Sequence, residues 1–521
     1  MSQSNHSAVD FGAQALLALR RFPDRVAFQS ETNRFSYSAT LDLIGRFQAV
    51  LAARGRKNGD IIAILTDNSF ESWCVTIAAQ ALGCGVTALH PKNAIADHIY
   101  QVADAGAKCL IIDVLGHGDS ASDLLPALDA DIDILAIGGA DFGPDLIALA
   151  DAVGSTTPLS RARPDDIAMI HYTGGTTGRA KGAVRLQRTA SAFALFAPLS
   201  DYELPGVPRY LGVAPNSHAA GTFLLPLLWR GGTIHLMRGF DVEQALATIE
   251  RERINFTFLV PSMIYTLLDH PSLDQYDISS LETLLYGASS ITPPRLLEAI
   301  ERLGPVMSQA YGQTECLPLS LLRRADHKAD TPHLLSSCGF PAASATVALL
   351  GEDGNPVPAG ETGEICVRSP AALDRYHNLP ELTAEALAGG WLHTGDIGTQ
   401  DEQGYLFIVD RKKDMIISGG FNIYSRDVED ALTSHEQVDV CAVIGTPHPK
   451  WGEAVTAYII RKPGADVSAD ALVAHVKGKK GSLYAPKRVE FVDVLPLTAV
   501  GKIDKKALRD RAGQASAPEK R

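Results

Sequence analysis

The feature that most restricts the possible folds is a repeated alternation of helical and strand-like segments in the first third of the chain. Residues 39–54 are amphipathic at helical spacing, and residues 60–65 form a short, almost wholly apolar run after them. Residues 108–113 and 132–137 repeat the strand-like pattern. Because short buried strands separated by helices occur in parallel sheets that helices cover on both faces, the sequence predicts an α/β fold.

Chain length and changes of texture predict the domain organisation. A chain of 521 residues exceeds what one hydrophobic core usually supports. From about Cys338 the sequence changes to Gly/Pro turns between short alternating strands, as at residues 345–350 and 364–368, which favours a small antiparallel barrel or sheet. The last hundred or so residues have their own strand–helix alternation. We therefore expect a large domain over residues 1–412, with two helix-flanked β-sheets and a small β-barrel, and a small α+β domain over residues 413–521.

Composition and charge restrict the partners. Sixty acidic against 47 basic residues give a formal net charge of −13, which argues against non-specific binding of nucleic acid. The seven cysteines include no Cys-x-x-Cys pair, and their odd number favours a reducing compartment, the cytoplasm. The first ten residues lack the apolar core of a signal peptide, and we expect no integral membrane segment. The sequence is compatible with a homodimer but does not fix the oligomeric state.

A glycine-rich segment follows the apolar run at residues 167–170. It reads His-Tyr-Thr-Gly-Gly-Thr-Thr-Gly-Arg-Ala-Lys-Gly over residues 171–182. Glycines let backbone amides converge on an anion, and the threonine hydroxyls and Lys181 add hydrogen-bond donors and positive charge. The segment is not a Walker A loop, because no hydroxyl residue follows the lysine. It predicts a phosphate cradle, and a plain glycine-rich surface turn is the alternative.

The same segment resembles the phosphate loop of the adenylate-forming superfamily, which comprises acyl-CoA synthetases, luciferases and the adenylation domains of peptide synthetases. Its one departure from the family's pattern is Ala180, where the family has proline. Further motifs match the same family in the family's order, so the resemblance covers nearly the whole chain. The loop residues that it implies for ATP binding are Thr173, Gly174, Gly175, Thr176, Thr177, Gly178 and Lys181.

A second motif, at residues 310–315, resembles the family's Tyr-Gly-x-Thr-Glu element. In the family the threonine contacts the α-phosphate and the glutamate holds magnesium, which implies these roles for Thr314 and Glu315. A carboxylate suits a hard cation that bridges phosphates and neutralises their charge. The alternative for Glu315 is a solvated loop side chain. The neighbouring nucleotide contacts that the motif implies are Tyr311, Gly312 and Gln313.

Three further segments imply contacts to the nucleoside. Asp396 matches the aspartate of the family's Thr-Gly-Asp element, which accepts hydrogen bonds from both ribose hydroxyls, and an ionised carboxylate is a natural partner for them. Arg411 matches the family's second contact to the ribose and phosphate. The small residues Gly287, Ala288 and Ser289 match the segment that lies along the adenine. Taken singly, these segments are as readily a buried turn aspartate, a surface arginine and a tight turn.

The segment at residues 496–504 resembles the family's C-terminal Pro-x-Thr-x-x-Gly-Lys-Ile element, whose lysine enters the site for adenylation. A carboxylate that attacks an α-phosphate approaches a like charge, and at about 4 Å the repulsion is about 4 kcal/mol at an effective dielectric constant of 20. A cation between the two groups removes this repulsion. We therefore expect Lys502 to be the catalytic residue of the first half-reaction, through electrostatic stabilisation. A solvated tail lysine is the alternative.

The resemblance also implies a movement and a site for coenzyme A. Family members rotate the small domain about a hinge just after the conserved arginine, which places the pivot at Lys413. In the second pose a glycine-lined tunnel would admit the pantetheine arm. The residues implied for coenzyme A are Gly419, Gly420, Trp451 and Lys487; for the last two the alternatives are a packed tryptophan and a solvated lysine. Next to the tunnel, Ser425 and Asp427 depart from the family's Pro-x-Glu.

The acyl pocket is predicted from small side chains. His218 lies where the family has an aromatic or histidine gate, and a histidine packed in the core is the alternative. The small residues 219–221 and the segment 316–318 favour an uncharged, apolar pocket. No basic residue near these stretches of sequence would balance a second carboxylate, and residues 214–218 lack the aspartate with which amino-acid-activating domains bind an α-amine. We therefore expect an apolar aromatic or medium-chain fatty acid as the substrate.

Together the motifs predict an ATP- and magnesium-dependent acid–CoA ligase. The carboxylate of a small-molecule acid attacks the α-phosphate to give an acyl adenylate and pyrophosphate, and the thiol of coenzyme A then displaces AMP. The alternatives are transfer of the acyl group to a carrier protein, a nucleotide-binding protein that has lost catalysis, and a luciferase-like oxygenase. The residues that argue against lost catalysis are Lys181, Glu315, Asp396, Arg411 and Lys502.

Overall fold

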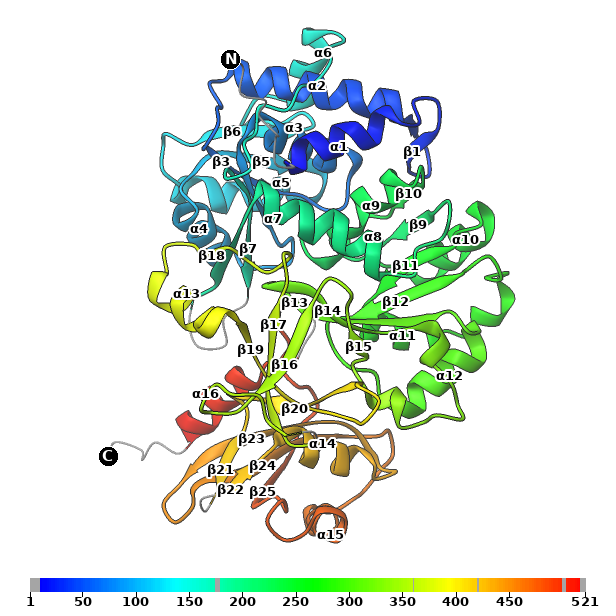
Figure 1. Cartoon of the computed structure of the whole chain (residues 1–521), viewed down its shortest axis with the longest axis vertical. Helices are drawn as coiled ribbons and strands as arrows, with labels where there is room; N and C mark the ends of the chain where they lie inside the picture. The colour runs from blue at the N-terminus through cyan, green and yellow to red at the C-terminus, as the bar shows by residue number, and fades with distance from the viewer. Residues whose placement is uncertain (1–9, 174–178, 359, 419–420, 499–502, 516–521) are drawn as a thin grey trace. The chain divides into compact units, whose positions relative to one another are not determined.

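The computed structural model describes residues 10–173, 179–358, 360–418, 421–498 and 503–515. The chain forms two compact units (Figure 1). The first holds the described residues up to Val347 together with Val367–Leu392, and the second holds Ala348–Cys366 and the chain from His393 onward. Within these ranges, no helix is long and apolar enough to cross a membrane. The domain boundary and hinge at Lys413 stay predictions.

The first unit contains a seven-stranded sheet in the order β18-β8-β7-β4-β3-β5-β6. The strands β3 to β7 are parallel, whereas β8 is antiparallel to β7 and β18 is antiparallel to β8. The strand bounds are Ile61–Leu65 (β3), Gly85–Leu89 (β4), Ala107–Asp113 (β5), Asp133–Ile137 (β6), Ile167–Thr173 (β7), Lys181–Leu186 (β8) and Arg375–Tyr376 (β18). The buried parallel strands that the sequence predicts are therefore confirmed.

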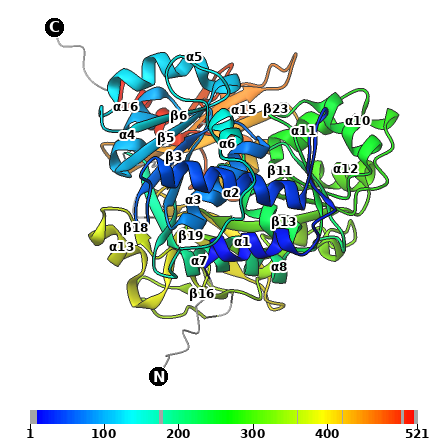
Figure 2. The same cartoon turned by 90° about the horizontal axis from the view of Figure 1, so that it is seen from above.

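Helices accompany this sheet, and local sequence sets where they begin and end. The helix predicted at residues 39–54 is α2. The next helix, α3, begins after Ser69, whose side chain caps it, and ends at Gly83, whose φ of 90° favours glycine. The helices α1, α2 and α3 pack on one another (Figure 2), and a Cβ atom at Gly12 in α1 would lie only 2.7 Å from the Cα of Ala81. The helix bounds are Phe11–Arg20 (α1), Tyr37–Ala53 (α2), Phe70–Leu82 (α3), Ile95–Asp104 (α4), Val114–Leu124 (α5) and Leu146–Val153 (α6).

A nine-stranded sheet in the same unit has the order β15-β14-β13-β12-β11-β9-β10-β1-β2. Its inner strands, from β13 to β1, are parallel, and β2, β14 and β15 add antiparallel edges. Pro261 ends β11 and opens α11, as its fixed φ and missing N–H favour at a first helical turn. The strand bounds are Val26–Gln29 (β1), Arg34–Ser36 (β2), Arg209–Gly212 (β9), Thr233–Leu236 (β10), Phe256–Leu259 (β11), Thr283–Gly287 (β12), Met307–Gln313 (β13), Cys316–Leu322 (β14) and Phe340–Pro341 (β15).

Helices α10 (Val242–Glu252), α11 (Pro261–Leu268) and α12 (Pro293–Leu303) supply part of the core that covers this sheet. Their side chains Leu246, Ile264 and Leu296 are wholly buried there. The helix predicted around residues 190–197 consists of α7 (Gln187–Ser191), a π-helical turn (Ala192–Phe196) and α8 (Ala197–Asp201), and α9 (Leu224–Trp229) follows later. π-helical turns inside helices are often found at functional sites, so this turn is a candidate part of one.

A four-stranded sheet with the order β16-β17-β19-β20 replaces the small barrel that we expected. Among the described residues the pairing runs in one line from β16 to β20. A closed barrel of four strands would enclose too little space for side chains, because barrel diameter grows with strand number. The bounds are Thr346–Leu350 (β16), Gly363–Arg368 (β17), Leu392–Gln400 (β19) and Leu406–Arg411 (β20), and α13 (Pro380–Ala386) lies between β18 and β19 in sequence.

The C-terminal part of the second unit is a five-stranded sheet with helices on both faces. Its order is β22-β21-β24-β23, with β25 paired to β24. Leu432 and Leu472 are buried in one hydrophobic cluster of this part, and Ile444 and Leu508 in another. This confirms the expected α+β character. The bounds are Ile416–Ser418 (β21), Phe421–Ile423 (β22), Val438–His448 (β23), Gly452–Arg461 (β24), Arg488–Phe491 (β25), Ser425–Thr433 (α14), Ala469–Lys480 (α15) and Lys505–Ala515 (α16).

Candidate active site

The strands β7 and β8 hold the two ends of the predicted phosphate loop. Their antiparallel register pairs Thr173 with Lys181, and the Thr173 hydroxyl donates to the Lys181 carbonyl with 3.5 Å between the oxygens. The loop therefore starts and ends at one place on the sheet, as a cradle for an anion requires. The predicted loop residues Gly174, Gly175, Thr176, Thr177 and Gly178 lie outside the described residues.

The predicted α-phosphate and magnesium contacts form the turn of a hairpin. Thr314 and Glu315 connect β13 to β14, whose register pairs Gln313 with Cys316. The turn follows the carboxyl end of β13, and open α/β sheets bind ligands at the carboxyl ends of their strands. The predicted contacts Tyr311, Gly312 and Gln313 lie on the last residues of β13.

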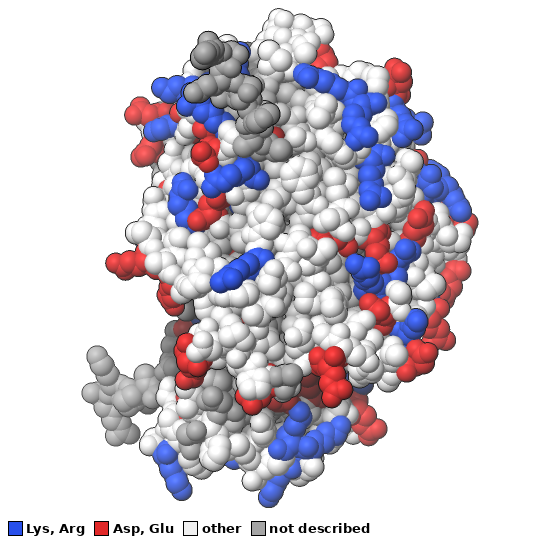
Figure 3. All heavy atoms as spheres, in the orientation of Figure 1, with Lys and Arg blue, Asp and Glu red and all other residues white. Residues whose placement is uncertain are grey.

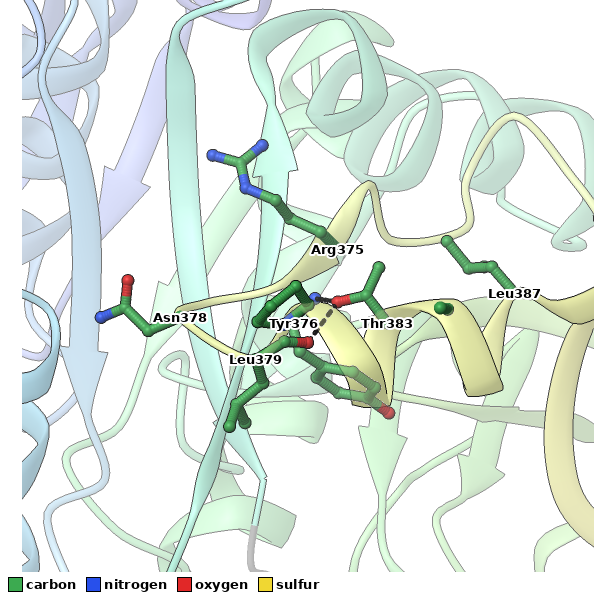
Figure 4. A pocket seen from close by; sticks show the side chains of 8 residues that line it. Arg375, Tyr376, Asn378, Leu379, Thr383 and Leu387 are labelled. Atoms are coloured by element: carbon green, nitrogen blue, oxygen red, sulfur yellow. Dashed lines mark hydrogen bonds between the residues drawn. The ribbon is translucent and has the colours of Figure 1, made fainter.

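Tyr376, which no sequence motif marks, connects Glu315 to Lys181. Its hydroxyl donates to Oε1 of Glu315 at 2.7 Å, and Nζ of Lys181 lies 5.8 Å from the centre of its ring. Its backbone N–H donates to the hydroxyl oxygen of Thr383 at 3.0 Å, which fixes it against α13 (Figure 4). Burial and the Glu315 carboxylate raise the pKa of Tyr376, so the hydroxyl stays protonated. The structure thus brings Lys181 and Glu315 into one cluster.

The surroundings of Glu315 fit a magnesium ligand. The residue is 8% exposed, and in the part of the chain that the structure describes no lysine or arginine nitrogen lies within 4 Å of its carboxylate. A buried carboxylate without a cationic partner is unfavourable until a cation binds. Carboxylate oxygens are among the ligands that Mg²⁺ prefers. Glu315 therefore has the chemistry of a metal ligand and lacks the partner of a structural ion pair.

The predicted adenine segment lies beside this hairpin. Gly287 ends β12 and is paired with Ala310 of the parallel strand β13. A Cβ atom at Gly287 would lie 2.6 Å from the Ala310 carbonyl oxygen, so only glycine permits this close approach. Ala288 has a φ of 71°, which is uncommon outside glycine and often marks a functional site. The segment Gly287, Ala288 and Ser289 therefore continues from a strand end next to the one that carries Thr314.

His218 lies in a group of histidines. Its ring is edge-on to that of His90, with 4.6 Å between the ring centres, and its Nδ1 lies 3.1 Å from the Ser217 hydroxyl. Burial lowers the pKa of His90 to about 3, and His218 adds to this effect. Burial, Arg185 and His218 lower the pKa of His171 to about 3 as well. His90 and His171 are therefore neutral near pH 7, and the predicted gate has polar neighbours.

A buried arginine lies near one of the two segments beside which we expected no basic residue, residues 316–318. Arg185, on β8, is wholly buried and donates from Nη2 to the carbonyl of Thr314. Its guanidinium carbon lies 3.6 Å from the centre of the Phe193 ring, on the π-helical turn. The prediction was wrong because it considered only residues near in sequence, whereas Arg185 precedes Thr314 by 129 positions. A charged residue inside the otherwise apolar strand was the available signal.

In the second unit the structure brings the two predicted ribose contacts together. The register of β19 and β20 pairs Asp396 with Arg411, and Nε of Arg411 lies 2.9 Å from Oδ1 of Asp396. The backbone N–H of Asp396 donates to the hydroxyl oxygen of Thr394 at 3.0 Å. The Asp396 side chain is 3% exposed and that of Arg411 47% exposed. A buried carboxylate is thus held by a cation that remains accessible.

Glu364, on β17, supports the turn that presents Asp396. It accepts the backbone N–H of Gly395 at 3.0 Å and Nζ of Lys412 at 3.2 Å. Burial raises the pKa of the Glu364 carboxyl, but the hydrogen bond from His393 and the charge of Lys412 outweigh it and lower this pKa. Gly395 has a φ of 71°, a conformation that favours glycine. Glu364 therefore stays ionised and fixes the backbone beside the aspartate.

Two of the predicted coenzyme A contacts also meet. Nζ of Lys487 lies 5.5 Å from the centre of the Trp451 ring, which stacks on His448 at 4.2 Å between ring centres. Gly452, which follows Trp451, pairs with Ser418 of β21. Ser418 precedes the predicted tunnel residues in sequence. The predicted residues Gly419, Gly420 and Lys502 lie outside the described residues.

The departure from the family at Ser425 has a structural counterpart. The backbone N–H of Ser425, which a proline would lack, donates to a carboxylate oxygen of Asp410. Nζ of Lys505, in α16, donates to the Ser425 hydroxyl at 2.7 Å and lies 2.8 Å from a carboxylate oxygen of Glu429. These contacts join the residue before Arg411 to the helix that follows the predicted catalytic lysine in sequence.

Comparison with protein families gives two matches. A family described as "AMP-binding enzyme" matches residues 16–377. A second, described as "AMP-binding enzyme C-terminal domain", matches residues 427–502. The first match alone covers more than half of the chain and includes the loop, hairpin and adenine segments of the first unit.

Three individual proteins resemble the chain over nearly its whole length. A medium/long-chain-fatty-acid–CoA ligase, FadD8 of Mycobacterium tuberculosis, is 42% identical over 95% of this chain and 88% of its own. A feruloyl-CoA synthase of Amycolatopsis is 34% identical over 96% and 99%. The solved structure of the amide bond synthetase McbA from Marinactinospora thermotolerans superposes with a TM-score of 0.88 at 34% identity, over 96% of this chain and 99% of that one.

Proposed function

The chain belongs to the AMP-binding enzyme family, and from this premise we propose how its residues carry out the reaction. It is an ATP-dependent carboxylic acid–CoA ligase, which forms an acyl adenylate and then an acyl-CoA thioester. Pyrophosphate leaves in the first step and AMP in the second. We propose which residues act in each step, which class of acid is activated and which movement occurs between the steps.

The observation that carries the assignment of roles is the cluster of Lys181, Tyr376 and Glu315. These side chains come from β8, from β18 and from the turn after β13, so only the fold brings them together. A cation at the base of a glycine-rich loop and a buried, unpaired carboxylate are the two groups that a nucleotide with a bound cation needs. In a surface turn the carboxylate would be solvated, and in an ordinary ion pair it would have a cationic partner, whereas Glu315 is buried at 8% exposure.

In the first half-reaction, the first unit holds the phosphates. Lys181 and the loop before it bind the β- and γ-phosphates, so the lysine anchors the leaving pyrophosphate. Thr314 contacts the α-phosphate from the tip of its hairpin. Gly287, Ala288 and Ser289 lie along the adenine, where the small side chains leave room for a flat ring.

Glu315 holds the magnesium ion, with Tyr376 donating to one of its carboxylate oxygens. When bound, the cation neutralises phosphate charge and thereby makes the α-phosphorus open to attack. The Tyr376 hydrogen bond fixes one Glu315 oxygen and so orients the carboxylate.

The second unit supplies the remaining groups of the first step. Asp396 accepts hydrogen bonds from the two ribose hydroxyls, and Arg411, whose Nε lies 2.9 Å from Oδ1 of Asp396, orients the carboxylate. Lys502 approaches the attacking carboxylate and the α-phosphate and lowers the repulsion between them. No proton has to move to or from Lys502 for this effect.

In the second half-reaction the small domain turns about Lys413 and presents coenzyme A to the adenylate. Gly419 and Gly420 line the path of the pantetheine arm. Trp451 and Lys487 contact the nucleotide end of coenzyme A. Nζ of Lys487 lies 5.5 Å from the centre of the Trp451 ring, and its ammonium group suits a phosphate. The thiol then attacks the acyl carbon, and AMP leaves with the bonding electrons.

The acid that we propose has an apolar body, either aromatic or of medium chain length. His218 closes the entrance of its pocket, with the small residues 219–221 beside it. The relatives support both shapes, because one of them is a fatty-acid–CoA ligase and another a feruloyl-CoA synthase.

A different acceptor is the second candidate function. The similarity to an amide bond synthetase at a TM-score of 0.88 favours considering an amine as the acceptor, and a carrier protein is the acceptor that the sequence left open. The contact between Trp451 and Lys487 supports coenzyme A as the acceptor. Coenzyme A carries a nucleotide whose phosphate a lysine can bind, whereas an amine and a protein-bound pantetheine carry no nucleotide.

We place the reaction in the cytoplasm. All seven cysteines are free and buried, which suits a reducing compartment. On the face drawn in Figure 3, acidic and basic side chains are interspersed, which supports small-molecule partners rather than nucleic acid. A homodimer stays a prediction, which sedimentation at several protein concentrations tests.

The test is ATP–pyrophosphate exchange over a panel of fatty and aromatic acids, followed by AMP release with coenzyme A, with a primary amine and with neither. We expect acid-dependent exchange without any acceptor and AMP release that requires coenzyme A. Exchange without any acid would contradict the ligase function. Exchange followed by turnover only with the amine would replace coenzyme A as the acceptor.

A further inference from the structure

Arg185 is a buried cation that the proposed reaction does not use. It lies on β8, four residues after Lys181, and residues four apart in a strand face the same side. At about 3.3 Å per residue the two Cα atoms are about 13 Å apart along the strand. Arg185 therefore faces the same side as the phosphate anchor but lies further along the strand from the phosphate loop.

The hydrogen bonds of this side chain are incomplete. Nη2 donates to the Thr314 carbonyl, whereas Nε and Nη1, both shielded from solvent, have no hydrogen-bond partner among the described residues. In the same part of the chain no carboxylate lies within 4 Å of the guanidinium. A buried donor without a partner costs about 1–3 kcal/mol, and an unpaired buried charge costs more. Such groups in a folded protein point to a ligand that completes them.

The guanidinium nevertheless stays charged. Burial lowers the pKa of Arg185 to about 10, and the carboxylates of Glu315 and Asp374 act in the opposite direction. His171, which also lies close enough to interact, is neutral because its own pKa is about 3. At neutral pH, Arg185 is thus a positively charged donor held by one carbonyl and one aromatic ring.

The neighbours of Arg185 belong to the region expected to bind the acyl group. Its guanidinium stacks on Phe193, whose ring lies 6.3 Å from that of His171. Cys316, which begins the segment predicted to line the acyl pocket, lies near both Arg185 and Tyr202. The buried Tyr202 hydroxyl also has no hydrogen-bond partner among the described residues. Two incompletely bonded polar groups therefore flank one predicted pocket residue.

We propose that Arg185 binds an oxygen acceptor on the acyl part of the acid, away from the carboxylate that reacts. The proposal rests on the acid–CoA ligase function and narrows its substrate class. The acid has an apolar body that ends in a carboxylate or a carbonyl oxygen, and the carboxylate fits best because it also neutralises the buried charge. Phe193 has to shift to admit the acceptor, and it lies on the π-helical turn.

The test compares three acids of one chain length: octanoic acid, 7-oxooctanoic acid and octanedioic acid. The readout is the ratio of kcat/KM values in acid-dependent pyrophosphate exchange. We expect the wild type to favour the two acceptor-bearing acids over octanoic acid by about 10²-fold or more, because a site built to bond an acceptor rejects the analogue that lacks it. In Arg185→Met, which keeps the volume and loses the donors, we expect this ratio to fall below about 3-fold.

Two further variants separate recognition from folding. Arg185→Lys keeps the charge without the forked donors and should give an intermediate ratio. Arg188→Met is the matched control, because Arg188 forms surface ion pairs with Asp165 and Asp374, and its ratio should equal that of the wild type.

If Arg185→Met fails to fold, the ratio of kcat/KM values of the wild type alone tests the proposal. A wild-type ratio near 1, or one that favours octanoic acid, would overturn the proposal. Equal losses for all three acids in Arg185→Met would assign Arg185 to the reacting carboxylate or to the support of Thr314, and would also overturn it. Absence of exchange with every acid in the wild type is a different result, which would overturn the ligase function itself.

Discussion

The charged side chains that the candidate site draws from the two units are held in opposite ways. In the first unit Glu315 and Arg185 are buried, and among the described residues neither has a charged partner within 4 Å. In the second unit Asp396 is equally buried but is paired with Arg411, and Glu364 is surrounded by His393, Lys412 and a backbone N–H. An unpaired buried charge is unfavourable in the free protein, and a bound ligand can supply its missing partner. A paired charge already has its partner, so its position is set before the ligand binds.

This contrast agrees with the division of work that we propose. The first unit receives the phosphates, the metal and the oxygen acceptor that we propose on the acyl group. The second unit presents a preformed contact for a neutral diol, which adds hydrogen bonds without adding charge. Changing an unpaired charge should therefore cost activity, and changing a paired one should cost binding and local order.

The largest effect is expected from Glu315→Gln. Glutamine keeps the shape and loses the charge that the metal needs, so acid-dependent pyrophosphate exchange should fall by about 10³-fold. Raising the Mg²⁺ concentration should not restore it. Glu298→Gln, in an exposed pair with Arg295 of the same unit, is the control and should keep full exchange. A loss of less than 10-fold would show that Glu315 is a structural residue.

The second effect is that of Asp396→Asn. Losing a charged acceptor for two hydroxyls should lower kcat/KM for ATP by about 10²-fold, mainly through a higher KM, because hydrogen bonds to charged groups contribute about 1.5–3 kcal/mol. Asp439→Asn, at an exposed position of β23, is the control. If kcat fell with KM unchanged, the aspartate would act on the reaction and not on ribose binding.

A smaller effect is expected from Tyr376→Phe. The variant keeps the ring beside Lys181 and removes the 2.7 Å hydrogen bond to Glu315. We expect about 10-fold slower exchange and a higher Mg²⁺ requirement, since one hydrogen bond to a charged group is lost. Tyr265→Phe serves as the control on the same unit. Unchanged exchange and an unchanged Mg²⁺ requirement would exclude a role for this hydroxyl in orienting Glu315.

The smallest effect concerns the histidines of the first unit. His90 stays neutral down to about pH 3 in the folded chain, whereas an unfolded histidine takes up a proton near pH 6.5. Protonation therefore favours unfolding as the pH falls below 6.5, by about 1.4 kcal/mol per pH unit for one such residue. Urea unfolding at pH 7.5 and 5.5 should show this loss, and His90→Asn should reduce it. Equal stability of the wild type at the two pH values would contradict the assignment.

Local patterns made much of the fold predictable. The helix at α2 and the strands β3, β5 and β6 follow from short-range apolar periodicity, which the structure confirms. Of the two alternatives that the sequence left open after Cys338, a small barrel or an antiparallel sheet, the described residues form the sheet. A pattern of short strands and turns does not specify whether the strands close into a barrel.

The site was predictable where motifs are local. Thr314 and Glu315 follow from one motif, and the structure adds that they form a hairpin turn. Tyr376 carries no pattern, since its role depends on β18 pairing with β8 from nearly two hundred residues away. Arg185 had a visible signal, a charge inside an apolar strand, but its nearness to Thr314 depends on two different sheets of the first unit.

The most direct test of the two-step account is Lys502→Ala, assayed separately for its two half-reactions. The account predicts that pyrophosphate exchange falls by about 10³-fold, because the cation between the carboxylate and the α-phosphate is lost. Transfer of a supplied acyl adenylate to coenzyme A should stay within about 3-fold of the wild type, since Lys502 acts only in the first pose. Equal losses in both half-reactions would contradict the account.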